Sequence, residues 1–578
     1  MDKLQKIFFL LWFSPLAFAS DNLTQPEVRS ALQNQSLVIG KHSMIVTNNP
    51  WSSRAAKQIL DNGGSATDAA ISAAFVLGLT EPQSSGIGGG GYALTYNSKT
   101  KTMVAFDGRE IAPATANPSW FLDKNGQPLD FKVAYKTPLA VGVPSEVALL
   151  RHMWQKNGKL AWATLLKPAI ELATSGFRIS PRLYGLLKSE EKELSQVSGF
   201  KDIYFTAEGK VKPIGTLVTN PKLAQSLKRI AKNPDDFYNG QLAKDIVNAI
   251  NSKAQKPIYQ LSDLSRYKIV THPPVCVNYR QKYKICSVPP STSGGVTMEE
   301  LMLIYSKVYS SSDINNSNWS YYFLEAAKLA YADRDQYIAD PAFIAQPIAG
   351  LLANDYITDR AKLISAKALP NPVIPGIPKG ANKAHIPDNS IKAPGTTSLA
   401  IVDKNGNAIS MTVTIEYQFG SHIFVDGFLL NNELTDFSFI PNKDGIPVAN
   451  RVQAFKRPRS SITPTMVFSP NGELKIVAGS PGGSQIICYV ARNLIAMLDF
   501  GLDPVQATSG GNLCISRGSS VAIESDSNLM TLIPMLQKRG ESVDIQSLVS
   551  GEVNIKHTAN GYEGGADPRR EGLAIGGD

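Results

Sequence analysis

A pair of threonines at the start of a strand-like run is the first place where this sequence can do chemistry. Thr396 and Thr397 follow Gly395 and lead into the apolar run 398–402. A Thr hydroxyl is a weak nucleophile unless a base lies beside it, and an α-amino group at a chain N-terminus can be that base. Cleavage of the Gly395–Thr396 bond would therefore activate Thr396. In an uncut chain both threonines would be ordinary strand formers.

A second hydroxyl lies on the next strand of the same expected hairpin. The runs 398–402 and 408–415 are separated by Asp-Lys-Asn-Gly-Asn, which is a hairpin signal. Thr396 and Thr414 are equally far from Asn405, so an odd-length loop centred there makes them cross-strand partners, with Cβ atoms roughly 4.5–5.5 Å apart. A two-residue Asn-Gly turn would instead place them on opposite faces. In the first register Thr414 can orient Thr396.

A glycine-rich turn further along can supply backbone donors. The strand-like run 474–478 meets Gly-Ser-Pro-Gly-Gly-Ser at 479–484, and a helix pattern follows to about residue 500. Gly482 and Gly483 leave their N–H groups unobstructed, and such a nest at a helix N-terminus can hold an oxyanion. A tight turn that needs positive φ would use the same glycines.

The elements around these residues fall into two regions joined by a Pro-rich segment. Residues 40–368 show mixed helix and strand patterns, and the residues after about 395 are strongly β-patterned. Between them, 369–394 is rich in Pro, Gly and Asn, which predicts a loop or linker. A structureless stretch of this length is usually functional or a junction, and it suits cleavage just before Thr396.

Composition and charge exclude several classes of protein. The chain has 578 residues, 43% of them hydrophobic, with 58 basic and 49 acidic side chains and a net charge of +9. Such a chain is not intrinsically disordered. The charge excess is scattered, and the one short cluster, Lys-Arg-Pro-Arg at 456–459, lacks interleaved aromatic residues. We interpret it as a solvated or substrate-side loop and expect no nucleic-acid partner.

No metal or cofactor motif is found in the sequence. The six His have no metal-ligand spacing and none neighbours a Cys. A G-x-x-x-x-G-K-[ST] phosphate loop and a G-x-S-x-G elbow are both lacking. We therefore expect neither a metal nor a cofactor.

The first residues have the pattern of a secretory signal peptide. Lys3 and Lys6 precede the apolar run 7–18, and Ala17-Phe18-Ala19 fits a cleavage site. The run is too short to span a bilayer, and no later segment reaches about 18 uncharged apolar residues. We expect removal of 1–19, a periplasmic or secreted protein, and no membrane span after that removal.

Export permits disulfides, and one pair of the four Cys has the spacing for it. Cys276 and Cys286 are equidistant from Gln281, the centre of an expected hairpin, and would lie opposite each other within bonding reach. Cys488 in an expected helix and Cys514 in an expected loop are predicted to be buried free thiols.

Longer stretches resemble one known family in order and spacing over nearly the whole mature chain. They resemble the γ-glutamyltranspeptidase family (glutathione hydrolases) of N-terminal-nucleophile enzymes. The matching stretches are NGGSATDAAIS at 62–72, GIGGGGYAL at 86–94, DGREIAP at 107–113, PPSTSGG at 289–295, AYADRDQYIADP at 330–341, GTTSLAIVD from 395, LLNNELTDFS from 429, KRPRSSITPT from 456, GSPGGS from 479 and GGADPRREG at 564–572.

The resemblance implies a fold and an activity. The fold would be α+β, the αββα sandwich of N-terminal-nucleophile hydrolases. Self-cleavage would give a large subunit, 20–395, and a small subunit, 396–578, that stay together as a heterodimer. Thr396 would take a γ-glutamyl group from glutathione or another γ-glutamyl compound and release it to water or to an amino acid or peptide acceptor.

The resemblance also implies roles for individual residues. Thr414 matches the family's supporting Thr, and Gly482 and Gly483 match its oxyanion-hole pair. A guanidinium with hydroxyls suits a substrate α-carboxylate, and two carboxylates suit an α-ammonium. Arg109, Ser460 and Ser461 match the carboxylate cradle, and Glu433 and Asp436 match the ammonium site.

One position departs from the family pattern. Two residues after the supporting Thr the family often has Asn, whereas this chain has Glu416. If Glu416 points into the site, it joins Glu433 and Asp436, and the repulsion would raise at least one carboxyl pKa. A substrate ammonium relieves that repulsion and a glutaryl group does not, so a γ-glutamyl donor is preferred.

Two other functions remain open at the level of sequence. A glutaryl- or cephalosporin-type amide acylase could use the same fold, and Glu416 points that way. The expected lid loop, 438–459, lacks the Tyr that some relatives place over the site, which leaves the acceptor preference open. A non-catalytic periplasmic protein that binds γ-glutamyl compounds would also suit a long exported chain without a cofactor motif.

Overall fold

Strands β10 (Thr396–Val402) and β11 (Ala408–Thr414) are buried on both faces, and this determines the architecture around them. Leu399 and Ile401 belong to one apolar core, while Ala400 and Val402 belong to another on the opposite face. Successive side chains of a strand point to opposite sides, so a strand with two apolar faces must be covered on both.

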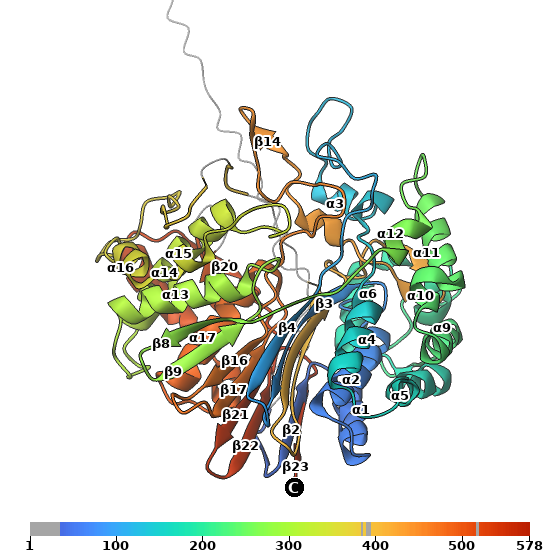
Figure 1. The fold of residues 1–578 in the computed structure, drawn as a ribbon, viewed down its shortest axis with the longest axis horizontal. Helices are drawn as coiled ribbons and strands as arrows, with labels where there is room; N and C mark the ends of the chain where they lie inside the picture. The colour runs from blue at the N-terminus through green and yellow to red at the C-terminus, as the bar shows by residue number, and fades with distance from the viewer. Residues whose placement is uncertain (1–34, 383–384, 389–394, 516–519) are drawn as a thin grey trace, which may run out of the picture.

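The computed structural model describes residues 35–382, 385–388, 395–515 and 520–578, so the predicted signal peptide 1–19 lies outside the described residues. Within those ranges two seven-stranded sheets lie face to face, and every neighbouring pair of strands in them is antiparallel (Figure 1). In sheet order the first contains β23 (Leu573–Gly577), β2 (Ser43–Thr47), β10, β11, β3 (Gly90–Asn97), β4 (Thr102–Gly108) and β7 (Val270–His272). The second contains β1 (Val38–Gly40), β22 (Gly561–Ala566), β21 (Val553–Thr558), β17 (Leu474–Gly479), β16 (Thr465–Phe468), β9 (Tyr283–Ser287) and β8 (Val275–Tyr279).

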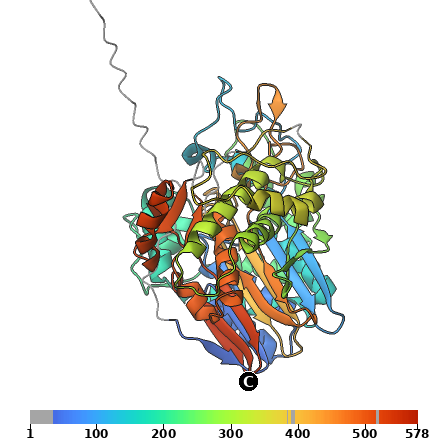
Figure 2. The same cartoon turned by 90° about the vertical axis from the view of Figure 1, so that its left-hand side faces the viewer.

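Helices cover the outer face of each sheet, which confirms the predicted αββα sandwich (Figures 1 and 2). Helix α2 (Ala66–Thr80) lies against β10 and β11 and is buried along almost its whole length, because other helices cover its far side. On that side lie α1 (Pro50–Asp61), α2 (Ala66–Thr80), α4 (Glu146–Asn157) and α5 (Trp162–Ser175), with α9 (Pro221–Lys232) and α11 (Gln241–Asn251) beyond them. On the other side lie α13 (Gly294–Val308), α14 (Asn318–Tyr337), α16 (Asn354–Ala361) and α17 (Ile486–Leu498).

Shorter elements connect these layers. A three-stranded sheet beside α17 contains the only parallel pair among the described strands, β19 with β20. The shorter elements are α3 (Phe131–Ala134), α6 (Pro181–Ser189), α7 (Glu191–Leu194), α8 (Phe200–Tyr204), α10 (Asp236–Asn239), α12 (Leu261–Ser265), α15 (Ile348–Leu351), α18 (Pro504–Ser509), α19 (Ile533–Lys538), β5 (Phe177–Arg178), β6 (Leu217–Val218), β12 (Phe424–Val425), β13 (Phe428–Leu429), β14 (Asn442–Lys443), β15 (Ile446–Pro447), β18 (Leu513–Ile515), β19 (Val521–Glu524) and β20 (Val543–Gln546).

Both sheets mix strands from before and after the Pro-rich segment. The first sheet places β10, β11 and β23 among β2, β3, β4 and β7, and the second places β1, β8 and β9 at its edges around the later strands. The described parts of 369–394 contain no helix, as expected of a linker. Their one bridge joins Ile386 to Val448. The two halves of the chain therefore share both sheets and both cores and are not separate domains.

The structure contains two disulfides. Cys276 and Cys286 are cross-strand partners of β8 and β9 and are bonded, as the hairpin predicted. Cys488 and Cys514 are also bonded, so the prediction of free thiols is wrong, and Cys514 lies in β18 rather than in a loop. The reason is tertiary: α17 packs on β18 and brings the two Cα atoms to 5.5 Å, although no local pattern links the residues.

Candidate active site

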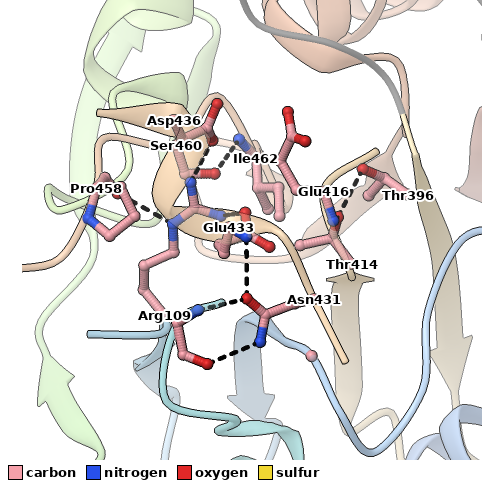
Figure 3. Close-up of polar contacts among 12 residues, drawn as sticks. Arg109, Thr396, Thr414, Glu416, Asn431, Glu433, Asp436, Pro458, Ser460 and Ile462 are labelled. Carbon is pink, nitrogen blue, oxygen red and sulfur yellow. Dashed lines mark hydrogen bonds and ion pairs between the residues drawn. The ribbon is translucent and has the colours of Figure 1, made fainter. Parts of the chain in front are cut away.

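The two predicted hydroxyls meet at the open end of the β10–β11 hairpin. Thr396 and Thr414 are cross-strand partners, as the odd-length loop predicted, and their Oγ1 atoms are 3.1 Å apart (Figure 3). Both side chains are buried, with 5% and 2% exposure. Register alone thus brings the second hydroxyl to the first.

Counting hydrogens shows which hydroxyl donates. The Thr414 hydroxyl has one hydrogen, and its oxygen lies 2.8 Å from the carbonyl oxygen of Gly395, which can only accept. The same Thr414 oxygen accepts from the N–H of Glu416 at 2.8 Å. A hydroxyl oxygen has two lone pairs, so its contact with Thr396 is one in which Thr396 donates. Thr414 therefore donates a hydrogen bond to the Gly395 carbonyl and accepts one from Thr396.

Close packing and a buried arginine fix the Gly395–Thr396 bond in place. A Cβ at Gly395 would lie 2.2 Å from the carbonyl oxygen of Glu416, so no larger residue fits. Arg570, fully buried, donates from Nη1 to the Thr396 carbonyl oxygen at 2.7 Å and from Nε to Ser550. The peptide groups on both sides of the bond are thus held by hydrogen bonds.

The glycine turn lies between β17 and α17, as expected. Gly482 and Gly483 have φ of +138° and +60°, and a Cβ on Gly482 would lie 2.4 Å from the ring of Tyr489. Both the left-handed conformation and the close ring favour glycine here. Gly483 lines the same pocket as Thr396 and starts the short helical turn Gly483–Gln485.

At the other end of the pocket an arginine faces two carboxylates. Arg109 follows β4, and its Nη1 and Nη2 pair with Glu433 and Asp436, while Nε donates to the carbonyl of Pro458 at 3.0 Å (Figure 3). Burial lowers and the facing Asp436 carboxylate raises the pKa of Arg109, with a net rise, so the guanidinium remains charged. Asn431 supports the arrangement by accepting from the Glu433 N–H at 2.9 Å.

The two predicted serines form the third side of this end. The Ser460 oxygen accepts from the N–H of Ile462 at 3.1 Å, and the Ser461 oxygen accepts from Arg334 at 2.8 Å. Each oxygen already accepts, so the hydroxyl hydrogens are the groups that can donate to an anion.

Glu416 lines the pocket but has partners of its own. Its Oε2 accepts from the Asn432 amide and from the Thr435 hydroxyl. Its backbone has φ of +75°, a left-handed conformation two residues after β11 ends at Thr414. Neutral hydrogen-bond donors thus stabilise the carboxylate that departs from the family pattern.

One pocket contains nearly the whole predicted site. Every predicted site residue lines it except Gly482, and its free volume is about 20 Å³, room for roughly one water molecule. A substrate therefore requires side chains to move. The lining residues are Arg109, Thr396, Thr414, Glu416, Glu433, Asp436, Ser460, Ser461, Ile462, Gly483 and Ile486.

The basic cluster at 456–459 is not solvated. Lys456 and Arg459 are fully buried, and Arg457 pairs with Asp107 at 3.3 Å. The cluster lies beside the predicted site, because the Pro458 carbonyl accepts from Arg109, and its substrate-side role stays a prediction. The interpretation as a solvated loop is wrong, since Arg457 and Arg459 pair with acidic residues from distant segments and Lys456 donates to the Ala449 carbonyl and to Gln453.

Comparison with known proteins identifies the family. A family model described as Gamma-glutamyltranspeptidase matches residues 52–577. The chain belongs to this family. It is 35% identical over 553 residues to "Glutathione hydrolase proenzyme" of Bacillus subtilis, covering 93% of this chain and 92% of that protein. It is 32% identical over 547 residues to the protein of the same name in Escherichia coli, covering 92% and 91%.

Solved structures agree with membership of this family and with the chain being an enzyme. The γ-glutamyltranspeptidase of Helicobacter pylori is 31% identical, with a TM-score of 0.52 over 58% of this chain and 93% of that one. A cephalosporin acylase from Bacillus halodurans superposes with a TM-score of 0.82 over 98% of this chain and 100% of that one. At 23% identity it shows the fold alone.

Several residues at the site were not predicted as functional. Arg570, Asn431 and Arg334 each contact a predicted site residue, although all three lie in stretches that carried the resemblance. An Arg or Asn within a motif is a usable signal of a functional residue. The site residue that it contacts is 174 residues away for Arg570, 2 for Asn431 and 127 for Arg334, so only the contact of Asn431 is local.

Proposed function

We propose that this chain is an exported γ-glutamyltransferase and glutathione hydrolase that cleaves itself before Thr396. The observation that carries the proposal is the hydroxyl relay: Thr396 donates to Thr414, which donates to the Gly395 carbonyl. The nucleophile, its proton acceptor and the polarised carbonyl lie in one hydrogen-bonded chain. A Thr oxygen of an uncut chain has its target beside it.

Self-cleavage follows from that relay. Thr396 Oγ1 attacks the Gly395 carbonyl carbon and passes its proton to Thr414, while Thr414 passes its own hydroxyl proton to the Gly395 oxygen. The C–N bond then breaks as the Gly395 carbonyl re-forms, and the proton on that oxygen moves to the Thr396 nitrogen, which becomes an amine. Gly395 is left as an ester on Oγ1. Water hydrolyses the ester, which frees the Gly395 carboxylate and the Thr396 hydroxyl.

The freed amine is the base for turnover. With a pKa of about 7.7–8.0 it accepts the Thr396 hydroxyl proton near neutral pH. The hydroxyl then attacks a γ-glutamyl carbonyl, the leaving amine takes the proton, and water or an acceptor amine resolves the ester. The N–H groups at Gly482 and Gly483 are the proposed donors to the oxyanion.

The charged end supports a zwitterionic donor. Arg109 with Ser460 and Ser461 would bind the α-carboxylate, and Glu433 and Asp436 the α-ammonium. These groups now pair with each other, so a zwitterion exchanges internal ion pairs for external ones and no buried charge is left alone. A glutaryl group offers only the carboxylate.

The proposal includes the processed form and its location. Subunits 20–395 and 396–578 would remain a heterodimer because both sheets contain strands of both. Export rests on the signal-like segment 1–19. Among the residues that the structure describes, no helix is long and apolar enough to cross a bilayer.

Donor kinetics test the proposed function. We expect the wild-type protein to cleave a γ-glutamyl anilide at least tenfold more efficiently than a glutaryl anilide, since a lone buried carboxylate is costly. Thr396→Ala should abolish both reactions. Thr397→Ala is the matched control, because its side chain contacts Asn48 outside the pocket. A preference for the glutaryl donor would favour the acylase, and glutathione binding without turnover would favour a binding protein.

A further inference from the structure

The last turns of α14 contact both ends of the active-site pocket. Tyr331 and Arg334 are three residues apart and share one helix face. The Arg334 guanidinium lies over the Tyr331 ring, 5.6 Å from its centroid. Both side chains are nearly buried, with 6% and 4% exposure.

Arg334 holds the two serines of the carboxylate end. Its Nη2 donates to Ser461 Oγ at 2.8 Å, and its Nε donates to Ser293 Oγ at 2.8 Å. Ser293 in turn donates from Oγ and from its backbone N–H to the Ser460 carbonyl, at 2.6 and 2.9 Å. One guanidinium thus fixes a side chain of the cradle directly and its backbone through a single serine.

The contact with Arg334 also orients the Ser461 proton. The serine oxygen accepts from the guanidinium, so the serine hydrogen points to another acceptor. Ser461 and Arg109 both line the active-site pocket. Ser461 is thereby prepared to donate to an anion.

Tyr331 holds the glycine turn at the nucleophile end. Its hydroxyl donates to the carbonyl of Ser484 at 2.6 Å, directly after Gly483. The same oxygen lies 3.6 Å from both sulfurs of the Cys488–Cys514 disulfide, which packs behind it. Burial raises the pKa of Tyr331, so the hydroxyl keeps its hydrogen at neutral pH.

We propose that Tyr331 and Arg334 are positioning residues that set the distance between the α-carboxylate cradle and the oxyanion turn. Because both sit on one rigid helix, this distance selects donors with three carbons between the α-carboxylate and the scissile carbonyl. β-Aspartyl donors, with two, would reach only one end. The inference rests on the proposed function and adds how the same site selects donors by their length.

Three donors separate positioning from general structure. They are a γ-glutamyl anilide, a β-aspartyl anilide that is one methylene shorter, and a 4-aminobutyryl anilide that lacks the α-carboxylate. For Arg334→Lys, which keeps the charge but loses the fork, we expect KM for the γ-glutamyl donor to rise about tenfold. KM for the 4-aminobutyryl donor should stay unchanged.

Tyr331→Phe should give the opposite kinetic signature. We expect kcat to fall about tenfold for both the γ-glutamyl and the 4-aminobutyryl donors, since a displaced oxyanion donor weakens the transition state. KM should change little. Both variants should reduce the preference for the γ-glutamyl over the β-aspartyl donor.

Matched controls come from α14 itself and from α16, which contacts it. Tyr337→Phe removes an equal 2.6 Å bond to a backbone carbonyl, but that of Gly376 in the linker. Arg360→Lys alters a buried guanidinium that contacts Asp333 of α14. Both should keep wild-type kinetics. The inference is wrong if the controls match the test variants, or if Arg334→Lys raises KM equally for donors with and without the carboxylate.

A failure of folding or of the proposed function can be recognised separately. If Arg334→Lys does not mature, Ser293→Ala takes its place. It removes only the hydroxyl that links Arg334 to the Ser460 carbonyl, and it is judged by the same KM criterion. A wild-type protein without γ-glutamyl turnover would refute the proposed function. An active wild-type protein whose Tyr331 and Arg334 variants keep its constants and donor preference would refute this inference alone.

Discussion

The two ends of the pocket are built in different ways. The nucleophile end consists of hydroxyls and backbone groups on neighbouring strands, with Thr396 and Thr414 paired by register. The carboxylate end consists of buried charges from separate loops, with Arg109 facing Glu433 and Asp436 more than 300 residues further along the chain. An end positioned mainly by strand register, with Arg570 on the Thr396 carbonyl, suits bond making, and an end built from charged side chains suits recognition.

This difference separates the expected effects of mutation. Damage at the nucleophile end should reduce self-cleavage and kcat, because those groups act on the reacting atoms. Damage at the charged end should raise KM, because those groups bind the part of the donor that does not react. Each prediction below tests that division, in order of decreasing effect on turnover.

The largest effect is expected for Thr414→Val. The substitution keeps the shape of the side chain but removes the donor to the Gly395 carbonyl and the acceptor for Thr396. We expect self-cleavage to slow about 100-fold, the usual cost of losing an oxyanion donor. A time course on denaturing gels measures the rate.

Thr412→Val is the control for that experiment. Thr412 lies on the same face of β11, two residues earlier, and its hydroxyl pairs with Ser398 at 2.8 Å rather than with Thr396. It should mature at the wild-type rate. Equal slowing in both variants would mean that strand packing, and not the hydroxyl relay, limits cleavage.

Arg109→Lys should have an intermediate effect. Lys keeps the positive charge but cannot pair with two carboxylates and the Pro458 carbonyl at once. We expect KM for a γ-glutamyl donor to rise about 10- to 30-fold, the loss of one charge-assisted bond, with kcat within about threefold of wild type. Steady-state kinetics decide; a fall in kcat with constant KM would contradict the division between the two ends.

Glu146→Gln should leave turnover at neutral pH nearly unchanged and alter only the pH dependence of stability. Burial raises the pKa of Glu146 from 4.5 to about 8, and Glu110 beside Arg109 is raised to about 8 in the same way. The folded state then keeps a proton that the unfolded state releases. The contribution of these two carboxyls to the free energy of unfolding is therefore complete below pH 4.5 and is lost as pH rises from 4.5 towards 8.

Glu146→Gln removes the loss of stability that comes from Glu146 and leaves the one that comes from Glu110. Relative to wild type, Glu146→Gln should gain roughly 3–5 kcal/mol between pH 4.5 and pH 8. Urea unfolding at both pH values measures it, with Glu193→Gln on the surface as control. Parallel pH profiles for Glu146→Gln and wild type would show that the buried carboxyl is not held protonated.

The sequence predicted the nucleophile end well because its geometry is local. Equal spacing about Asn405 was enough to pair Thr396 with Thr414, and equal spacing about Gln281 was enough to pair Cys276 with Cys286. Turn chemistry placed Gly483 between a strand and a helix. In each case the hydrogen bonds of a hairpin or turn determine the contact.

The charged end could be predicted only through resemblance, because its contacts are tertiary. No spacing rule places Arg109 against Glu433, or Cys488 against Cys514. For the same reason the sequence permits a solvated loop at 456–459: Asp107 and Asp388, the acidic partners of Arg457 and Arg459, are distant in sequence.

The intact mass of the purified protein tests self-cleavage before Thr396 most directly. We expect two components, 20–395 and 396–578, with Thr396 at the N-terminus of the smaller one, and a single uncut chain for Thr396→Ala. An uncut wild-type chain that still turns over γ-glutamyl donors would contradict it. So would a Thr396→Ala chain cut at the same bond.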